Sequence, residues 1–260
     1  MSVMQLFDLT GKVALITGGT KGLGLQMAEA LGEQGAKIFI NARKADEVEA
    51  VVADLNKRGI EAAGIVCDLG DLSTNPIKTL VDAAEERFGT IDVLVNNAGT
   101  SWGQPAVEHS YEGWQKVMIL NVDVFFLLAQ EVARRFMIPR KSGKIINIAS
   151  IAGLKGNRAD SGIFTVAYNT SKAAAINLTR TLAGEWGQYN INVNAICPGY
   201  FPTKMSKGLE KASELIIKGT PLGRVGGDED IKGLALFLAT EASRHVTGQA
   251  VAIDGGNSVV

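Results

Sequence analysis

Residues 12–24 read Lys-Val-Ala-Leu-Ile-Thr-Gly-Gly-Thr-Lys-Gly-Leu-Gly. The first part is a short apolar run, which is typical of a buried parallel strand. A glycine turn follows at once, and residues 25–31 are helix-forming. Glycine lets the backbone come close to a phosphate, and the first turn of a helix offers free N–H groups to an anion. The stretch therefore predicts a pyrophosphate-binding turn, although Gly18, Gly22 and Gly24 follow G-x-x-x-G-x-G rather than the common G-x-G-x-x-G. A turn without a ligand is the alternative for an isolated match, but the strand and helix context favours binding.

Apolar runs of strand length alternate with helix-forming stretches along the rest of the chain. This alternation predicts a parallel, doubly wound sheet with right-handed crossovers. We expect an α/β fold of the Rossmann type, formed as a single domain over residues 1–260, with seven strands and helices on both faces. The expected strands lie near residues 13–17, 37–41, 63–67, 93–95, 145–149, 192–196 and 251–253. The expected helices lie near residues 23–34, 45–58, 76–88, 111–135, 170–188 and 229–239.

The composition suits one large core and excludes some partners. Of the 260 residues 46% are hydrophobic, and the formal net charge is −1. A nearly neutral chain gives no indication of a nucleic-acid or membrane partner, and the longest apolar stretch, residues 124–129, is too short to span a bilayer. No charged-then-apolar signal segment opens the sequence, so a cytoplasmic location is expected.

The cysteines and histidines indicate neither a disulfide nor a metal site. Cys67 and Cys197 stand at or beside predicted buried strands, and a reducing compartment keeps such thiols free. His109 and His245 lack a Cys, His or acidic partner at ligand spacing, so no metal is predicted.

Tyr168 and Lys172 form a candidate acid/base pair. Four residues apart on a helix, their side chains share one face. An ammonium beside a phenol favours the phenolate and so lowers the tyrosine pKa from its usual value of about 10. Such a pair suits the reduction of a carbonyl or the oxidation of an alcohol.

With these motifs the sequence resembles the short-chain dehydrogenase/reductase family over nearly its full length. The family's landmarks occur in the family's order: the glycine turn, Asp68, Asn96-Asn97-Ala98-Gly99, Asn121, Ser150, Tyr168 with Lys172, Pro198-Gly199 with Thr203, and Asp254-Gly255-Gly256. The resemblance implies an NAD(P)-dependent oxidoreductase acting on CH–OH groups.

The end of the second expected strand predicts which nicotinamide cofactor binds. NAD-binding sheets usually place an acidic residue there, but this chain has Asn41-Ala42-Arg43-Lys44. The guanidinium of Arg43 suits a 2′-phosphate by charge and by its fork of donors, and Lys21 in the glycine turn supplies a second cation. Asp46 and Glu47 are expected to stabilise a helix N-terminus. NADPH/NADP+ is therefore predicted over NADH/NAD+, with a solvated basic loop as the alternative.

The resemblance also implies a set of cofactor contacts. Asp68 and Leu69 match positions beside the adenine, and Asn97 matches a contact to the nicotinamide ribose, whereas Asn96 is expected to tie strands together. A helix N-cap is the alternative role for Thr203. The full predicted set is Gly18, Thr20, Lys21, Gly22, Leu23, Gly24, Arg43, Lys44, Asp68, Leu69, Asn97, Ala98, Gly99, Tyr168, Lys172, Pro198, Gly199, Phe201 and Thr203.

Four residues are predicted to be catalytic. Tyr168 donates the proton, and Lys172 lowers its pKa and binds the nicotinamide ribose. Ser150 hydrogen-bonds the carbonyl oxygen, and Asn121 holds a water that relays protons. The spacing from Ser150 to Tyr168 is longer than usual in the family, which predicts a loop at residues 156–165 beside the substrate.

The substrate is expected to be a small molecule with a carbonyl or alcohol group. The predicted pocket segments, residues 100–105, 151–166 and 200–221, bring together an apolar set: Trp102, Phe164, Tyr200, Phe201 and Met205. This lining favours an acyl or cyclic carbonyl over a polyhydroxylated sugar acid. The flanking motifs resemble the 3-oxoacyl reductase branch, including the rhamnolipid type, and this resemblance implies a 3-oxoacyl thioester or related ketone.

Several alternatives stay open. Gly184 precedes Glu185 where carrier-protein reductases tend to have Arg, which weakens docking of a carrier protein. A polyol or sugar-acid dehydrogenase of the gluconate type, a cyclic-alcohol or ketone dehydrogenase, and a catalytically inactive nucleotide sensor share the fold. A cation cluster, Arg134, Arg135, Arg140 and Lys141, either closes a helix or docks an acidic carrier or a phosphate-bearing substrate.

A homotetramer is predicted from apolar residues on two long helices. The helices expected at residues 111–135 and 170–188 carry Phe125, Phe126, Leu178 and Trp186, more than one sheet face can cover. Pairing across a two-fold axis would bury them.

Overall fold

One parallel sheet organises the molecule. The computed structural model describes residues 2–157, 161–202 and 213–260. Its seven strands run in the order β3-β2-β1-β4-β5-β6-β7, and every neighbouring pair is parallel. They are β1 (Val13–Thr17), β2 (Lys37–Ala42), β3 (Ala62–Val66), β4 (Val93–Asn96), β5 (Gly143–Ile148), β6 (Ile191–Pro198) and β7 (Ala250–Ile253). The central strands are buried throughout, which explains why β1 and β4 are mostly apolar rather than alternating. β5 and β6 also bury polar residues, among them Asn147 and Asn194.

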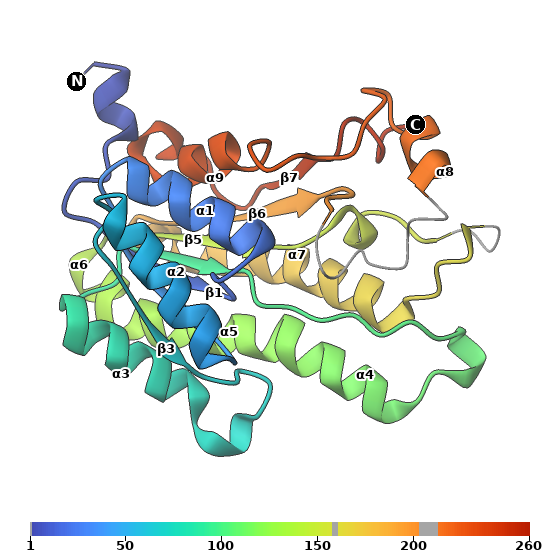
Figure 1. Cartoon of the computed structure of the whole chain (residues 1–260), viewed down its shortest axis with the longest axis horizontal. Helices are drawn as coiled ribbons and strands as arrows, with labels where there is room; N and C mark the ends of the chain where they lie inside the picture. Colours follow the sequence, from blue (N-terminus) through green and yellow to red (C-terminus); the bar gives the residue numbers. More distant parts are fainter. Residues whose placement is uncertain (1, 158–160, 203–212) are drawn as a thin grey trace.

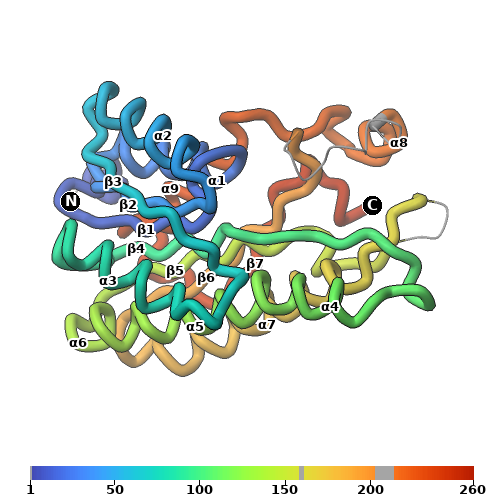
Figure 2. Tube along the Cα trace, turned by 60° about the horizontal axis from the view of Figure 1, so that its bottom comes forward, coloured from blue at the N-terminus to red at the C-terminus, as the bar shows by residue number. Residues whose placement is uncertain are grey.

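Helices cover both faces of the sheet (Figures 1 and 2). One face carries α1 (Gly22–Glu33), α2 (Ala45–Lys57) and α9 (Lys232–Ala239), whose apolar residues join the strands in one core cluster. The other face carries α3 (Pro76–Phe88), α5 (Val124–Val132) and α7 (Val166–Trp186), which pack into a second cluster. The predicted fold class, a doubly wound parallel sheet, is confirmed.

The helix expected at residues 111–135 is interrupted twice. It consists of α4 (Tyr111–Met118), a π-helical segment at Ile119–Asp123, α5, a second π-helical segment at Ala133–Met137, and α6 (Ile138–Arg140). Each π-helical turn widens the helix, and such turns often occur at functional sites. The first one contains Asn121.

Several short helices were not expected from the sequence. They are α8 (Ser213–Lys218) and 3-10 turns at Met4–Phe7, Leu72–Thr74, Ala106–Glu108, Ile151–Gly153, Gly187–Tyr189 and Glu241–Ser243. In addition, α7 begins at Val166, four residues before the expected start at residue 170. Tyr168 therefore lies in its first turn.

The candidate site lies where the strands end. Because all strands are parallel, their carboxyl ends meet at one edge, on the right in Figure 1. The chain crosses to β2 on one side of β1 and to β4 on the other, so β1 and β4 flank a topological switch point. Ligands of open α/β sheets bind in the crevice at this point.

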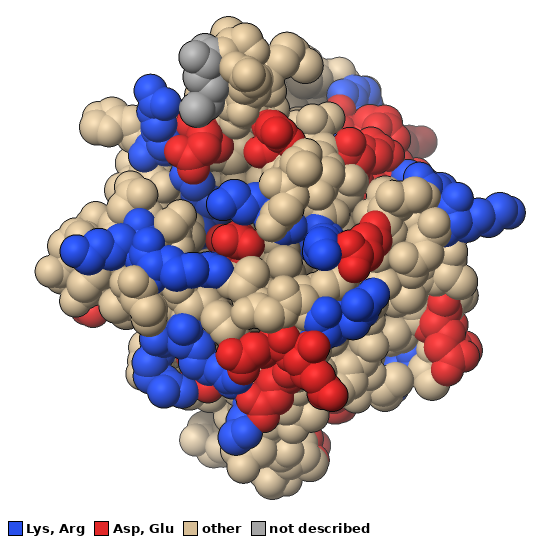
Figure 3. Space-filling view, turned by 90° about the vertical axis from the view of Figure 1, so that its left-hand side faces the viewer, with Lys and Arg blue, Asp and Glu red and all other residues tan. Residues whose placement is uncertain are grey.

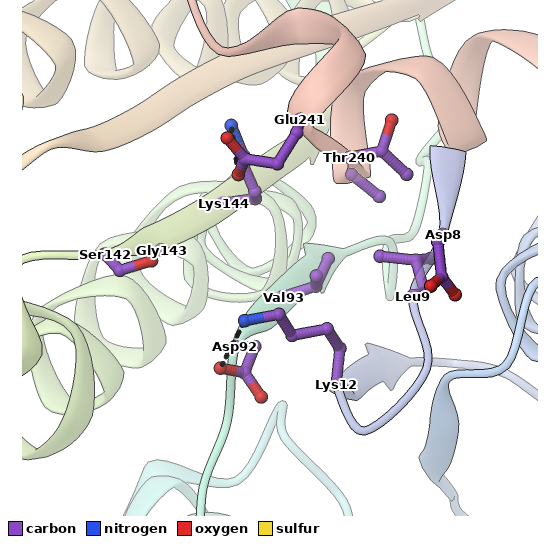
Figure 4. Close-up of a pocket in the computed structure, with 11 residues that line it drawn as sticks. Asp8, Leu9, Lys12, Asp92, Val93, Ser142, Gly143, Lys144, Thr240 and Glu241 are labelled. Atoms are coloured by element: carbon purple, nitrogen blue, oxygen red, sulfur yellow. Dashed lines mark ion pairs between the residues drawn. The ribbon is translucent and has the colours of Figure 1, made fainter. Parts of the chain in front are cut away.

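The opposite edge of the sheet is covered by paired charges. Figure 3 shows Lys and Arg interspersed with Asp and Glu over the side that lies at the left in Figure 1. A pocket of about 30 Å³ at the amino ends of β1, β4 and β5 is lined by charged and polar side chains together with Leu9, Val93 and Ala239 (Figure 4). Its two lysines are paired, Lys12 with Asp92 at 3.9 Å and Lys144 with Glu241 at 3.8 Å. This pocket is far from the carboxyl edge and takes no part in the candidate site.

The predicted cation cluster lies largely in ion pairs. Arg134 lies 2.7 Å from Glu131, and Arg135 pairs with Glu85 and also lies 2.7 Å from Asp82. Arg140 lies 3.4 Å from Asp92. These pairs favour the structural role of the cluster over docking, because three of its four charges are already compensated.

Three further features concern ligands and location. Cys67 and Cys197 are buried free thiols. Cys67 follows β3 and Cys197 lies in β6, and four strands, β2, β1, β4 and β5, lie between these two in the sheet. Among the described residues no cluster of His, Cys, Asp or Glu could hold a metal ion. Within the same ranges, none of the helices has the length and apolar character needed to cross a membrane.

Candidate active site

The glycine turn between β1 and α1 has the shape that an anion requires. Gly18 and Gly22 have φ angles of +64° and +53°, which favour glycine. A Cβ on Gly24 would lie 2.4 Å from the carbonyl oxygen of Gly18, so the helix and the turn touch without room for a side chain. Lys21 precedes the helix and makes no side-chain cap. The first N–H groups of α1 are therefore available to a pyrophosphate.

Hydrogen bonds between strand ends hold this turn in place. The Thr17 hydroxyl accepts hydrogen bonds from the N–H groups of Asn97 and Ala98, both at 2.9 Å. The Asn97 amide donates to the carbonyls of Thr17 at 2.8 Å and Gly18 at 3.3 Å. The side-chain nitrogen of Asn97 thus holds the turn, and only its Oδ1 is left for the predicted ribose contact.

The side chains of Asn41 and Asn96 also form hydrogen bonds that link the ends of neighbouring strands. Asn41 accepts from the N–H of Gly18 at 3.2 Å and donates to the carbonyl of Cys67 at 3.0 Å, which joins the ends of β1, β2 and β3. Asn96 donates to Asn147 at 2.9 Å and so links β4 to β5, as predicted. Thr17 and Asn41 were not predicted from the sequence, although Thr17 ends β1, Asn41 is the last residue but one of β2, and both are buried polar residues in apolar strands.

The region expected to meet a 2′-phosphate carries three cations. Arg43 is exposed and has no ion pair within the described parts of the chain. Lys21 lies 2.7 Å and Lys44 3.5 Å from the carboxylate of Glu47. Glu47 does lie in the first turn of α2, as expected, but it also binds these two lysines.

Asp68 and Leu69, the two residues predicted to lie beside the adenine, differ in burial. Asp68 is exposed and accepts a hydrogen bond from the N–H of Gly70 at 2.9 Å. Leu69 is buried in the core, so only its backbone is available to a ligand. Leu23 likewise packs against the core from the start of α1, and Thr20 is buried beside Glu47.

The catalytic candidates Ser150, Tyr168 and Lys172 come together at the ends of β5 and α7. Ser150 follows β5 and forms a hydrogen bond with Tyr168. Lys172 is buried, and its ammonium donates to the carbonyl of Ile148 at 2.7 Å. The same ammonium lies 5.6 Å from the centre of the Tyr168 ring and 5.3 Å from that of Phe125.

Burial shifts the pKa values of both Tyr168 and Lys172. It raises the pKa of Tyr168 above its usual value, and the hydrogen bond from Ser150 offsets only part of this rise. Burial also lowers the pKa of Lys172 to about 8. The sequence predicted that Lys172 lowers the pKa of Tyr168, but the pKa is raised instead, because burial of the phenol is the largest influence on it. The phenol stays protonated near neutral pH, the state that a proton donor needs.

Asn121 ties this centre to the segment after β4. Its side chain accepts from the N–H of Thr100, donates to the carbonyl of Thr100 and donates to the Ser171 hydroxyl, each at 2.9 Å. Ser171 in turn donates to the carbonyl of Tyr168 at 2.8 Å. Both N–H groups of the amide side chain are thus used, and its oxygen or the main-chain carbonyl would have to accept a hydrogen bond from the water predicted for Asn121. Sequence reasoning missed Ser171, which lies between the two catalytic positions.

Gly99 connects the cofactor side to the catalytic side. A Cβ at this position would lie 3.1 Å from Oδ1 of Asn121 and 3.5 Å from Nζ of Lys172. The backbone of the predicted cofactor segment therefore passes directly beside the buried lysine.

Polar contacts close the loop that precedes α7. Asn157 donates to the Ile163 carbonyl at 3.1 Å and to the Thr165 hydroxyl at 3.0 Å. That hydroxyl donates to Asn169 at 2.8 Å, next to Tyr168. The N–H of Gln104 donates to the Phe164 carbonyl at 2.9 Å, which joins the loop to the segment after β4.

The C-terminal turn holds the same loop from the other side. The Lys155 ammonium donates to the main-chain and side-chain carbonyls of Asn257, at 2.6 Å and 2.8 Å. Asn257 is buried, and its amide donates to the Gly219 carbonyl at 2.9 Å. The C-terminal turn thus connects the loop after Ser150 to the end of α8.

The predicted apolar lining is only partly available to a substrate. The ring of Phe201 is buried against Gly226, where a Cβ would lie 2.4 Å away, so its predicted cofactor contact is limited to the backbone. The Trp102 ring covers Gly113 in the same manner, at 2.8 Å. Phe164 is 45% exposed, and burial raises the pKa of the half-buried Tyr200. Met205 lies outside the described residues.

The segment expected to hold the carboxamide follows β6. Pro198 ends that strand, and the N–H of Gly199 donates to the carbonyl of Ile253 at 3.0 Å. A Cβ on Gly199 would lie 2.7 Å from Cα of Asp254, so this position has room only for glycine. Thr203 lies outside the described residues.

Comparison with known proteins agrees with this geometry. Residues 18–258 match the family described as enoyl-(acyl carrier protein) reductase. A 2-dehydro-3-deoxy-D-gluconate 5-dehydrogenase of Dickeya dadantii is 41% identical over 258 residues, which cover 98% of each chain. The chain belongs to the short-chain dehydrogenase/reductase family.

Other members of the short-chain dehydrogenase/reductase family resemble the chain along its full length. The gluconate 5-dehydrogenase of Gluconobacter oxydans is 38% identical over 100% of this chain and 99% of its own. The crystal structure of a gluconate 5-dehydrogenase from Burkholderia cenocepacia, in complex with NADP and tartrate, superposes with a TM-score of 0.92. That protein is 35% identical, with 100% of both chains covered.

Proposed function

We propose that this enzyme is an NADP-dependent dehydrogenase/reductase that interconverts a keto group and a secondary alcohol on a sugar acid of the gluconate class. The observation that carries the proposal is the full-length similarity to gluconate 5-dehydrogenases and 2-dehydro-3-deoxy-D-gluconate 5-dehydrogenases. This supports the alternative from the sequence analysis better than its main interpretation, a 3-oxoacyl reductase.

The surroundings of the site also favour a polar substrate. Asn157, Thr165 and Asn169 close the loop before Tyr168 with polar side chains. Two residues that were expected to form an apolar lining, Trp102 and Phe201, pack against glycines of their own chain instead. The ion pairs of the cation cluster leave little support for an acyl carrier.

The chain has the groups that NADP requires. The glycine turn presents free N–H groups at the start of α1, and Arg43, next to the end of β2, has no ion pair with any described residue. Lys21 and Lys44 both lie beside Glu47. The bound nicotinamide would supply or accept the hydride, and the related enzyme of known structure holds NADP.

The chain's own residues would handle the proton and the substrate oxygen. In reduction, Tyr168 donates its phenolic proton to the carbonyl oxygen, while Ser150 hydrogen-bonds and orients that oxygen. Lys172 places a positive charge beneath the phenol and favours the phenolate that remains. Asn121 and Ser171 keep the first turn of α7 fixed against the segment after β4.

A substrate panel tests the proposal. NADPH turnover would be measured with 5-keto-D-gluconate, a 3-oxoacyl-coenzyme A ester and a cyclic ketone, and NADP+ turnover with gluconate. We expect kcat/KM to be at least about tenfold higher for the sugar acids, the discrimination that buried polar groups readily provide. Faster turnover of the thioester would overturn the proposed substrate class.

We further propose a homotetramer. An apolar groove of about 430 Å³ lies between α5, α7 and the 3-10 turn at Leu72–Thr74. It is lined by Leu72, Val122, Asp123, Phe126, Leu127 and Leu178. Phe126 is 39% exposed there, and burial raises the pKa of Asp123. A second copy of the chain would cover this surface.

The cytoplasmic location stays a prediction, and the free thiols Cys67 and Cys197 are compatible with it.

A further inference from the structure

One carboxylate lies among the cations at the end of β2. Oε2 of Glu47 is 2.7 Å from Nζ of Lys21, and its Oε1 is 3.5 Å from Nζ of Lys44. The Thr20 hydroxyl also donates to this carboxylate, at 3.4 Å. The Glu47 side chain is 23% exposed, whereas those of Lys21 and Lys44 are 53% and 62% exposed. Glu47 is thus the most enclosed of the three charged groups.

The carboxylate remains charged under all ordinary conditions. Its hydrogen bond with Lys21 lowers the pKa of Glu47, with smaller contributions from the nearby charges of Lys21 and Lys44. Two of the three cations near the predicted 2′-phosphate position therefore share a negative partner. Arg43 has none within the described ranges.

We propose that Glu47 limits the preference of this enzyme for NADP over NAD. A 2′-phosphate placed among Lys21, Arg43 and Lys44 would lie close to a fixed carboxylate, and like charges repel each other. The 2′-hydroxyl of NAD carries no charge and would feel no such penalty. Glu47 is a specificity-determining residue on this view, and the inference rests on the proposed binding of the 2′-phosphate at Arg43.

Glu47→Gln tests the inference, because glutamine keeps the size of the side chain and its ability to accept a hydrogen bond from Thr20. Dissociation constants for NADPH and NADH would be measured by fluorescence of the reduced cofactor. We expect NADPH to bind about fivefold more tightly, the effect of one exposed charge–charge interaction, while NADH changes by less than about twofold. The gain should shrink in high salt, because salt screens exposed charges.

Asp46→Asn is the matched control. Asp46 is the neighbouring acid in the first turn of α2 but makes no ion pair with any described residue. Asp46→Asn removes one negative charge from the same helix turn as Glu47→Gln does. It should therefore leave the ratio of the NADPH and NADH dissociation constants unchanged. An equal gain for Asp46→Asn would overturn the specific role of Glu47, because the effect would then be one of net charge.

Arg43→Ala separates this inference from the proposed cofactor. NADPH affinity should fall by at least about tenfold in Arg43→Ala, the scale of a lost charged hydrogen bond, with NADH unaffected. If that result holds but Glu47→Gln leaves NADPH binding unchanged or weaker, the role of Glu47 is overturned and the cofactor assignment stands. If Arg43→Ala weakens both cofactors equally, the cofactor assignment fails together with the inference.

Discussion

Tyr168 is the residue on which the proposed chemistry depends most directly. Tyr168→Phe keeps the ring in the first turn of α7, so the fold and NADPH binding should be preserved. Turnover should fall by about 10²–10⁴, because general acid catalysis is typically worth that much. Steady-state kinetics and NADPH fluorescence measure the two effects separately.

Two companion variants serve as controls for Tyr168→Phe. Ser150→Ala should lower turnover with little effect on NADPH affinity. Lys172→Ala should lower both, because its ammonium is buried between the catalytic helix and the Ile148 carbonyl. A Tyr168→Phe enzyme that keeps more than about a tenth of its activity would require another proton donor, given the usual range for this role.

The raised pKa of Tyr168 predicts different pH profiles for the two reaction directions. Reduction needs the neutral phenol, which predominates at every pH below the raised pKa. Oxidation needs the phenolate, whose fraction rises about tenfold per pH unit below that pKa. Oxidation should therefore accelerate between about pH 5 and about pH 7, where Lys172, with its pKa of about 8, stays charged, while reduction stays nearly constant. Parallel profiles in both directions would contradict the assignment of Tyr168 as the titrating group.

The sequence predicted which side chains are catalytic candidates, but it could not predict the hydrogen-bond partners of these and the neighbouring side chains. Ser150, Tyr168 and Lys172 follow from the motifs, whereas the commitment of the Asn121 and Asn97 side chains to other segments does not. Those hydrogen bonds join residues up to 80 positions apart in the chain, so they exist only after the sheet has formed. The direction of the Tyr168 pKa was mispredicted for the same reason, since a local motif contains no information about burial.

At the scale of elements, the glycine turn is the feature that a single methyl group should disrupt. Gly24→Ala would place a Cβ 2.4 Å from the Gly18 carbonyl and 2.5 Å from the Asn97 amide. Overpacking of this kind costs about 1–3 kcal/mol, so NADPH affinity should fall at least about fivefold. Titration of the cofactor fluorescence measures this change.

Gly233→Ala is the control for that substitution. It lies exposed in α9, and a Cβ there would meet no atom within 4 Å. Alanine is the better helix former by roughly 0.5–1 kcal/mol, so thermal stability should stay the same or rise slightly. NADPH binding to Gly24→Ala at the wild-type level would show that the close approach of α1 to the turn is unnecessary.

The strands could be predicted closely, and the helices less so. Buried parallel strands are short apolar runs, so each expected strand lies within two residues of the observed one at both ends, as β1 and β7 illustrate. The π-helical segments in the helix at residues 111–135 could not be predicted, because the wide turn at Asn121 depends on hydrogen bonds to Thr100 and Ser171. Residue propensity does not encode such tertiary contacts.

For the molecule as a whole, the exposed Phe126 predicts how the subunits associate. Phe126→Glu should convert the proposed homotetramer to smaller species, because a charge would replace an aromatic ring in the apolar groove. Size-exclusion chromatography with light scattering at micromolar concentration would show the change in mass. Val66→Glu is the control, since that side chain is 48% exposed on the edge strand β3 and does not line the groove. A wild-type monomer would contradict the assembly.

The turn at the end of the chain has a practical consequence for anyone who purifies the enzyme. Asn257 is buried between Lys155 and Gly219, only three residues before the terminal Val260. An affinity tag fused there would pull on the segment that fixes the loop after Ser150. The amino terminus lies at the opposite side of the molecule in Figure 1, next to the exposed turn at Met4–Phe7. Recombinant protein should therefore carry its tag at the amino end, and a low specific activity measured with a carboxyl-terminal tag would say little about the natural substrate.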